Sequence, residues 1–510
     1  MRKVGWKLSG AAVLAVCCGV LLGAVAAAET LTIAHNLDPE TLNPLMTTAA
    51  ASESVALAVV EKLVIFDTET SAPIPWLLES WEYVDATCVK LSIRKGISFS
   101  NGEPLDAEAV KFSLLAWMEQ PVMAQATQPF KDVEFEILDA NTIVLRFQQV
   151  VPTLLSLLAR YSYVVPPKYY AEVGPEGFGV HPIGTGPFVF VSHAPDYQVV
   201  FDKNPNYWRG ARPIDRVIFL VMPEDFARAA AVESGEADIA YYISDSMAAR
   251  LQGVSDVAVY PLPGMRKFGA FFNAEMAGGE PLLDARVRVA LNHAVDIEAI
   301  LGSVFNGNGE VLRGQFAFPG ELGYNSELPE YAYDPDLARS LIAQAGYPNG
   351  FTVTFAYPTG RYPKDKEVGE ILASYFEAVG VKTVQRPLEW GQFNSERKAQ
   401  TLGHIFFFGL LLIPDLQETF NYMAYGKQAR GAPMMTWPQE WWDLFSSTWT
   451  EPNPEKRAEV YHEMLQMDYE SPYAVYLYRT ADFYAARTSV KGFLPRADQM
   501  LFLYDVYLED

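Results

Sequence analysis

The sequence has little cysteine and histidine for its length. It contains 3 cysteines and 6 histidines among 510 residues. Cys17 and Cys18 lie in an N-terminal segment that we expect to be removed, so Cys88 would be alone and could form no intramolecular disulfide. No two histidines stand at the spacing of a metal site. The sequence therefore predicts a protein that is stabilised by its hydrophobic core and that carries no cofactor.

Basic residues are scarce as well. The chain has 39 Lys and Arg against 62 Asp and Glu, and three of the basic residues lie within 1–28, which leaves 36 − 62 = −26. A protein this acidic is repelled by nucleic acid and by anionic lipid. We therefore exclude nucleic acid as a partner, although a local ligand pocket can differ from the whole.

Catalytic motifs are missing. The sequence has no G-x-S-x-G elbow, no P-loop and no G-x-G-x-x-G after a strand. His462-Glu463 lacks the second histidine that a zinc-protease helix needs. We predict that the protein is not an enzyme; an extracytoplasmic hydrolase that uses a carboxylate pair is the alternative from another functional class.

Long apolar runs are confined to the N-terminus. Three basic residues precede the apolar stretch 11–25, and Ala26-Ala27-Ala28 offers a small-residue cleavage site. This pattern predicts a signal peptide over 1–28 and a periplasmic protein. A lipoprotein modified at Cys17 is the less favoured alternative, because Val16 is bulkier than the residue that usually precedes such a cysteine.

The rest of the chain alternates strand and helix patterns. Val217 to Val221 is an unbroken apolar run, as expected of a strand that is covered on both faces, and a helix and a strand from Ile239 follow. Phe351 to Phe355 alternates like a strand, and a helix that ends at Gly380 leads to a second strand over Val381–Gln385. Two such βαβ units predict two α/β domains with mostly parallel sheets.

Three motifs stand in order within one segment. They are Gly184-Thr185-Gly186-Pro187-Phe188, Asn204-Pro205-Asn206-Tyr207-Trp208-Arg209-Gly210 and Ser234-Gly235-Glu236-Ala237-Asp238-Ile239. The set resembles the signature of the solute-binding proteins of ATP-driven (ABC) importers, in the peptide/nickel class, family 5. The resemblance implies a periplasmic-binding-protein-like α/β fold of type II, in the large three-part form with two lobes and a hinge.

The resemblance also implies a division of the chain. We expect the core of lobe 1 in 29–62, 181–264 and 480–510, an inserted domain in 63–180, and lobe 2 in 265–479. Crossings near Val180, Leu262 and Tyr478 are the candidate hinges.

By the same resemblance, the protein captures a peptide or other small organic solute between its lobes. It then delivers the solute to an inner-membrane ABC permease, and we expect it to act as a monomer. A nickel-type metal-chelate receptor of the same class is the alternative, with His404 as its candidate contact.

The resemblance points to individual ligand-binding residues in lobe 2. In peptide-binding members an arginine after a lobe 2 strand holds the ligand carboxylate, and Arg361 matches that position. Those members hold the ligand amine with an acid, where this chain has Leu410; Asp415 is the nearest acid and could replace it if the loop folds inward. Tyr357 and Trp390 are aromatic candidates for the cleft wall, and each is equally consistent with a core position.

Overall fold

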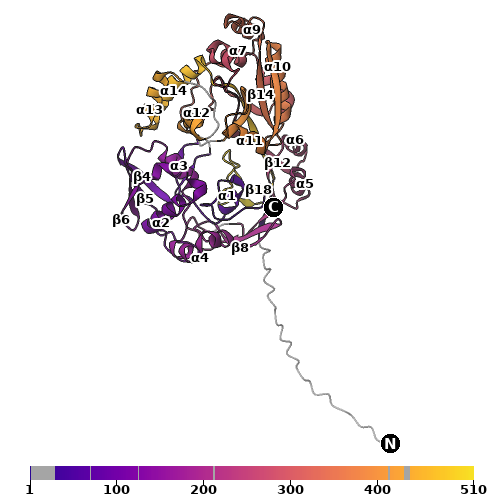
Figure 1. Cartoon of the computed structure of the whole chain (residues 1–510). Helices are drawn as coiled ribbons and strands as arrows, with labels where there is room; N and C mark the ends of the chain where they lie inside the picture. The colour runs from indigo at the N-terminus through magenta and orange to yellow at the C-terminus, as the bar shows by residue number, and fades with distance from the viewer. Residues whose placement is uncertain are drawn as a thin grey trace.

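The computed structural model describes residue 1 and residues 29–68, 71–124, 126–210, 213–411, 414–429 and 437–509. The predicted signal peptide and Cys17 therefore lie outside the described residues. Two lobes lie one above the other in Figure 1, with the indigo to magenta lobe 1 below and the orange helices of lobe 2 above.

One mixed sheet of 11 strands runs through both lobes. In sheet order the strands are β15 (Val381–Glu389), β14 (Phe351–Thr359), β16 (Ile405–Leu410), β12 (Val257–Phe272), β17 (Ala474–Arg487), β11 (Ile239–Ile243), β1 (Thr30–His35), β10 (Arg216–Val221), β9 (Gln198–Lys203) and β8 (Phe188–Ala194), with β13 (Gly309–Val311) beside β17. β14 runs parallel to β15 and β16, and β1 runs parallel to β10 and β11. The predicted βαβ units are thus present, whereas the strands that join them are antiparallel.

Helices cover this sheet in both lobes. Lobe 1 carries α1 (Ala50–Ala56), α5 (Asp225–Ser234) and α6 (Asp245–Leu251). Lobe 2 carries η3 (Glu280–Leu283), α7 (Ala285–His293), α8 (Ile297–Val304), α9 (Pro335–Gln344), α10 (Asp365–Ala378), α11 (Trp390–Lys398), α12 (Leu416–Ala429), α13 (Gln439–Thr448) and α14 (Pro454–Glu470). Asp106, Asp284, Asp296 and Asp334 each cap the helix that follows with a side-chain oxygen, as the residue types favour.

The predicted inserted domain packs as part of lobe 1. It holds β2 (Val64–Phe66), β3 (Pro73–Pro75), β4 (Leu78–Asp85), β5 (Cys88–Ile93), α2 (Ala107–Met118), η1 (Pro121–Met123), η2 (Gln128–Phe130), β6 (Glu134–Asp139), β7 (Thr142–Arg146), α3 (Leu154–Tyr161) and α4 (Pro167–Val180). Near the C-terminus, β18 (Val490–Lys491) pairs with β19 (Tyr507–Leu508). Val110, Leu114 and Trp117 of α2 lie in the same continuous hydrophobic core as Leu31 and Ile33 of β1. The crossing near Val180 therefore joins two parts of one body, and only the other two crossings connect the lobes.

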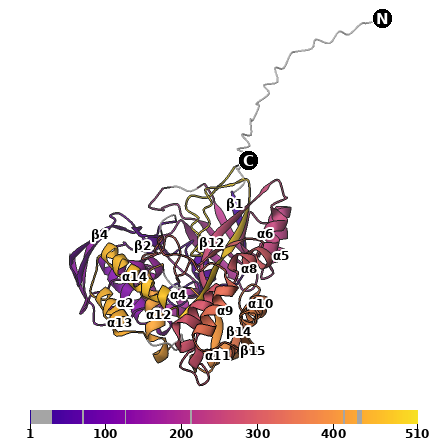
Figure 2. The same cartoon turned by 90° about the horizontal axis from the view of Figure 1, so that it is seen from above.

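Those two crossings lie inside long paired strands. Figure 2 shows the yellow β17 running through the middle of the molecule beside β12. The first half of β12 packs in lobe 1 at Val257, and its second half packs in lobe 2 from Phe268 onward. The register between β12 and β17 shifts between Pro263 and Lys267 and again after Phe268. The predicted lobe boundaries at 264 and 479 thus fall within strands, where the pairing is irregular.

A buried carboxylate explains two of the sequence motifs. Glu61 is 4% exposed and accepts hydrogen bonds from Trp76 Nε1 at 2.9 Å, Thr185 Oγ1 at 2.8 Å, Tyr207 OH at 2.9 Å and Trp208 Nε1 at 2.9 Å. Burial raises its pKa, and these four neutral donors act against that rise. The Gly-Thr-Gly-Pro-Phe and Asn-Pro-x-Tyr-Trp motifs therefore meet on one side chain.

The glycines of the first motif allow a close approach of two backbone segments. A Cβ on Gly184 would lie 1.9 Å from the carbonyl oxygen of Val59, and one on Gly186 would lie 2.6 Å from it. Gly186 N–H donates to that same oxygen at 2.8 Å. Any larger residue would push this turn away from the segment that carries Glu61.

Candidate functional site

The candidate site lies where three parallel strands of lobe 2 end. Because β14 pairs in parallel with β15 and β16, their carboxyl ends meet at one edge, which is where open α/β sheets bind ligands. Leu410 at the end of β16 pairs with Lys267, at the point where β12 enters lobe 2 from lobe 1. This edge therefore faces lobe 1.

Arg361 sits in a tightly held turn after β14. The Asp365 carboxylate accepts from the backbone N–H groups of Gly360 at 3.0 Å, Arg361 at 2.7 Å and Tyr362 at 2.9 Å. The Arg361 side chain is exposed, and its guanidinium carbon lies 4.9 Å from the centre of the Trp390 ring. No described carboxylate forms an ion pair with it, so the turn presents an uncompensated cation.

Aromatic side chains form the wall beside Arg361. Trp390 is half-buried and lies parallel to Phe408, with ring centres 6.3 Å apart and an interplanar angle of 5°. Tyr362 lies 6.2 Å from Trp390, and its hydroxyl donates to the Gly409 carbonyl at 3.2 Å. The structure therefore brings Arg361, Trp390 and the end of β16 together.

Leu410 is buried at the end of that strand and offers no charge. On the paired strand, the ammonium of Lys267 is bound by both carboxylate oxygens of Glu321, at 2.6 and 2.9 Å, and by Thr419 Oγ1 at 3.0 Å. The acid that holds a ligand amine in the peptide-binding pattern has no counterpart at position 410.

Asp415 is turned into the interior of lobe 2. It is 1% exposed, and its carboxylate binds Arg457 Nη2 at 3.2 Å, the Gln417 N–H at 2.9 Å and Tyr461 OH at 3.4 Å. Burial raises the pKa of Asp415, and Arg457 acts in the opposite direction. The carboxylate is thus committed to an internal ion pair, and we leave it out of the proposed site.

Tyr357 lies near the carboxyl end of β14 but its ring faces α10, and His404 lies at the opposite end of the sheet. A Cβ on Gly369 of α10 would lie 2.3 Å from the Tyr357 ring, so this ring fills the space between β14 and α10. His404 immediately precedes β16, at its opposite end; its Nδ1 accepts from the Thr354 N–H at 2.9 Å and its Nε2 lies 3.0 Å from the Ala277 carbonyl oxygen. Both ring nitrogens are occupied, and the described residues contain no cluster of three His, Cys, Asp or Glu that could hold a metal.

A pocket also lies between the lobes. It is lined by Phe66, Asp67, Thr68, Ser71, Met265, Pro414, Arg496, Ala497 and Asp498. Burial acts to raise the pKa of Asp498, but Arg496 beside it holds that pKa below its ordinary value. The pocket thus has walls from lobe 1, from the crossing strand β12 and from lobe 2.

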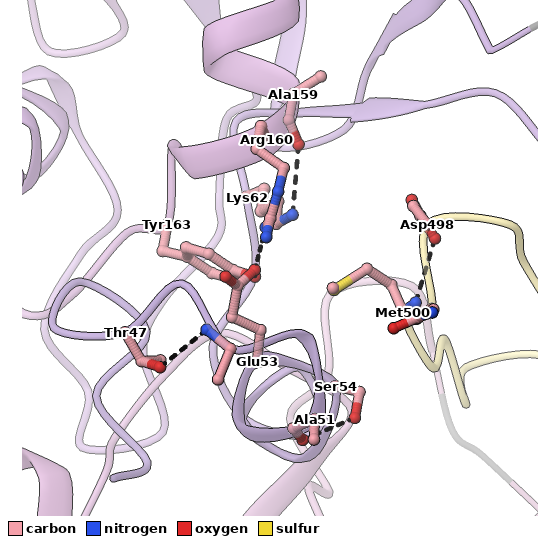
Figure 3. Close-up of polar contacts among 12 residues, drawn as sticks. Thr47, Ala51, Glu53, Ser54, Lys62, Ala159, Arg160, Tyr163, Asp498 and Met500 are labelled. Atoms are coloured by element: carbon pink, nitrogen blue, oxygen red, sulfur yellow. Dashed lines mark hydrogen bonds and ion pairs between the residues drawn. The ribbon is translucent and has the colours of Figure 1, made fainter. Parts of the chain in front are cut away.

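A buried polar cluster of lobe 1 lies behind this pocket. Figure 3 shows Arg160 and Tyr163 converging on the Glu53 carboxylate, with Lys62 alongside. Lys62 Nζ donates to the Ala159 carbonyl at 3.3 Å, and burial lowers the pKa of Lys62 to about 7. Sequence patterns did not indicate this cluster, because Glu53 and Arg160 are 107 residues apart along the chain.

The family profile of the bacterial extracellular solute-binding proteins, family 5 (middle part), matches residues 72–432. The chain belongs to this family. Family 5 solute-binding proteins serve ABC importers, and the relatives found are binding proteins rather than enzymes. Among the described residues, no helix combines the length and apolar character that a membrane crossing requires.

Individual family 5 proteins are similar over most of the chain. Heme-binding protein A of Haemophilus influenzae is 30% identical over 367 residues, which is 67% of this chain and 66% of that protein. The dipeptide-binding protein of Escherichia coli is 24% identical over 541 residues, covering 97% and 96% of the two chains. The structure of HbpA2 from Haemophilus parasuis superimposes with a TM-score of 0.83 at 23% identity and covers 94% of this chain and 100% of that one. The predicted two-lobed fold is confirmed.

Two residues of the candidate site were missed by sequence reasoning. Tyr362 lies beside Arg361 in the sequence and joins the aromatic wall, and Arg266 packs on the Tyr362 ring from β12. The sequence does contain a pattern that could have indicated Arg266. Arg266 and Lys267 are two adjacent cations in a strand that is otherwise apolar as far as Phe272. Alternation along a strand places one of them on each face.

Proposed function

We propose that this family 5 protein captures a small, peptide-like organic acid between its lobes and delivers it to an inner-membrane ABC permease. The observation that carries the proposal is Arg361, an exposed guanidinium without a described carboxylate partner, held by Asp365 beside Trp390. A planar guanidinium can bind a carboxylate through two parallel hydrogen bonds. The related proteins are named for heme and for dipeptides, and both of these ligands carry carboxylates.

The absence of an acid at position 410 limits the ligand further. An ammonium group buried beside Leu410 would lose its hydration without gaining a partner, which costs several kcal/mol. We therefore infer a ligand with an acidic end and a neutral, largely apolar remainder near β16.

Calorimetric titration of N-acetyl-Ala-Gln and of its C-terminal amide tests the role of Arg361. The wild type should prefer the free acid, and Arg361→Ala should weaken its binding by about 1.5–3 kcal/mol, or roughly 10- to 150-fold. Arg339→Ala removes a cation from the outer helix α9 and should bind like the wild type. Equal binding of acid and amide by the wild type would refute the proposed anion anchor.

We also propose that the mature chain begins at Glu29 in the periplasm. Glu29 N lies 3.1 Å from Asp215 Oδ2, so a free α-amino group at this position would gain an ion pair. The Glu29 side chain in turn accepts from the Leu508 N–H at 3.0 Å. The intact mass of the exported protein should correspond to residues 29–510, and a lipid-modified Cys17 would contradict this.

A further inference from the structure

We propose that Arg266 forms a second anion subsite next to Arg361, so that the preferred solute carries two acidic groups. This rests on the function proposed above and deepens it. Each acidic group would pair with one guanidinium, and Tyr362 would lie between the two.

Arg266 stands on the face of β12 that belongs to the candidate site. Lys267 after it is bound on the opposite face by Glu321. Arg266 Nη1 donates to the Gly409 carbonyl at 3.3 Å, and its guanidinium carbon lies 5.4 Å from the centre of the Tyr362 ring. The side chain is therefore fixed across the end of β16 rather than extended into solvent.

Gly409 provides the space for this arrangement. A Cβ at this position would lie 2.6 Å from the Phe268 ring and 3.0 Å from Arg266 Cδ. The residue that follows is Leu410, which stands where the peptide-binding pattern has its amine-holding acid. At this end of the cleft, Leu410 thus replaces the acid and Arg266 packs against the neighbouring Gly409. The local charge is therefore positive here, where the peptide-binding pattern has a negative charge.

The Arg266 guanidinium is not neutralised by a described carboxylate. No described acid lies within ion-pair distance of it, and its one hydrogen bond to a described residue goes to the Gly409 carbonyl. Asp482 of β17 is near enough to feel its charge but accepts instead from Gln499 Nε2, at 3.1 Å, and is also within reach of Tyr242. A guanidinium with four unused N–H groups at the mouth of a cleft is suited to bind an anion.

The spacing of the two arginines fits one small molecule. Arg361 and Arg266 each lie 5.4 Å from the centre of the Tyr362 ring, so their guanidinium carbons are at most 10.8 Å apart, twice that distance. Two like charges this close repel each other until anions neutralise them. A peptide whose C-terminal residue has an acidic side chain carries two carboxylates at such a separation.

Titration of N-acetyl-Ala-Glu and N-acetyl-Ala-Gln tests the second subsite. The two peptides have the same size and share the C-terminal carboxylate, and they differ only in the second acidic group. The wild type should bind the Glu peptide roughly 10- to 100-fold more tightly. Arg266→Met keeps the aliphatic stem over Tyr362 and should abolish this ratio while leaving affinity for the Gln peptide nearly unchanged.

Further variants separate the two proposals. Arg361→Met should weaken the binding of both peptides, and Arg339→Met should affect neither. Gly409→Ala should displace Arg266 and reduce the Glu-to-Gln ratio even though both arginines remain. If the wild type binds the Gln peptide through Arg361 but shows no preference for the Glu peptide, the second subsite is refuted alone. The second subsite is also refuted if Arg266→Met still binds the Glu peptide more tightly than the Gln peptide. If neither peptide binds to the wild type, the proposed function is overturned as well.

Discussion

At the scale of single residues, Asp468 is an acid in the core of lobe 2 for which the described residues provide no cation. It is 2% exposed, and its described hydrogen bond comes from Trp437 Nε1 at 3.3 Å. Burial raises its pKa from 3.8 to about 8. The folded protein therefore holds a proton at this site that the unfolded chain releases near pH 4.

This difference in pKa between the folded and the unfolded chain determines whether stability rises or falls with pH. Between about pH 4 and pH 8 the folded state binds more protons at Asp468 than the unfolded state does, so this group makes stability fall as the pH rises. The fall is at most about 1.4 kcal/mol per pH unit. Asp468→Asn should remove this contribution and raise the free energy of unfolding at pH 8 relative to the wild type.

Urea unfolding at several pH values measures the effect. The difference between Asp468→Asn and the wild type should grow from pH 5 to pH 8, whereas Glu134→Gln, which changes an exposed carboxyl of β6, should give no such trend. A constant difference across this range would show that Asp468 is ionised in the fold.

At the scale of elements, the start of α10 determines where Arg361 stands. Asp365→Ala would leave four backbone N–H groups, those of 360, 361, 362 and 366, without their acceptor, which costs about 1–3 kcal/mol of stability. Reordering the freed turn on ligand binding costs about 1–2 kcal/mol per residue, so affinity should fall by roughly 5- to 30-fold. Chemical unfolding and titration with N-acetyl-Ala-Gln measure the two losses separately.

Asp334→Ala is the matched control for this effect. Asp334 caps α9 by accepting from Asp336 N and Leu337 N, at 3.1 and 2.9 Å, far from the candidate site. Its removal should cost about 1 kcal/mol of stability and leave affinity unchanged. If Asp365→Ala also kept full affinity, the turn would not be what positions Arg361.

The elements themselves could be predicted from the sequence, but the faces of the buried strands could not. The spacing of apolar residues located β14, α10 and β15. The alternation from Phe351 to Phe355 stops at Ala356, as in a strand covered on both faces, so the sequence could assign Tyr357 to either face. The orientation of the Asp415 side chain could not be predicted for another reason. Its partner Arg457 lies 42 residues further along, and nothing in the sequence links the two residues.

At the scale of the whole molecule, the paired strands β12 and β17 carry the two crossings between the lobes and are the candidate hinge. Outside the sheet, the lobes also meet where Asn306 and Asn308 donate to the Asp245 carboxylate of α6, the latter at 2.5 Å. Binding of the solute recovered from the purified protein should draw the lobes together and reduce the radius of gyration in small-angle scattering. Arg361→Ala at the same subsaturating solute concentration should remain more open, and an unchanged radius at saturation would contradict the hinge.

The division of the chain into lobes could be predicted from the sequence only in part. The family motifs implied two lobes, which the structure has. The boundaries at 264 and 479 fell inside strands because a strand shared by two lobes has no linker composition that would mark the transition. The motifs likewise gave no indication that they meet on Glu61, since its four donors come from positions 76 to 208.

β17 lies in the middle of the sheet, and this position affects the order in which the two lobes can fold. Tyr476 and Tyr478 of this strand belong to the core of lobe 2, while Tyr484 and Ala486 belong to that of lobe 1. A ribosome makes residue 474 only after every other strand of the 11-stranded sheet, so both lobes lack a central strand until that point. Such long-range pairing folds slowly. Neither lobe can therefore complete its core before β17 has been made.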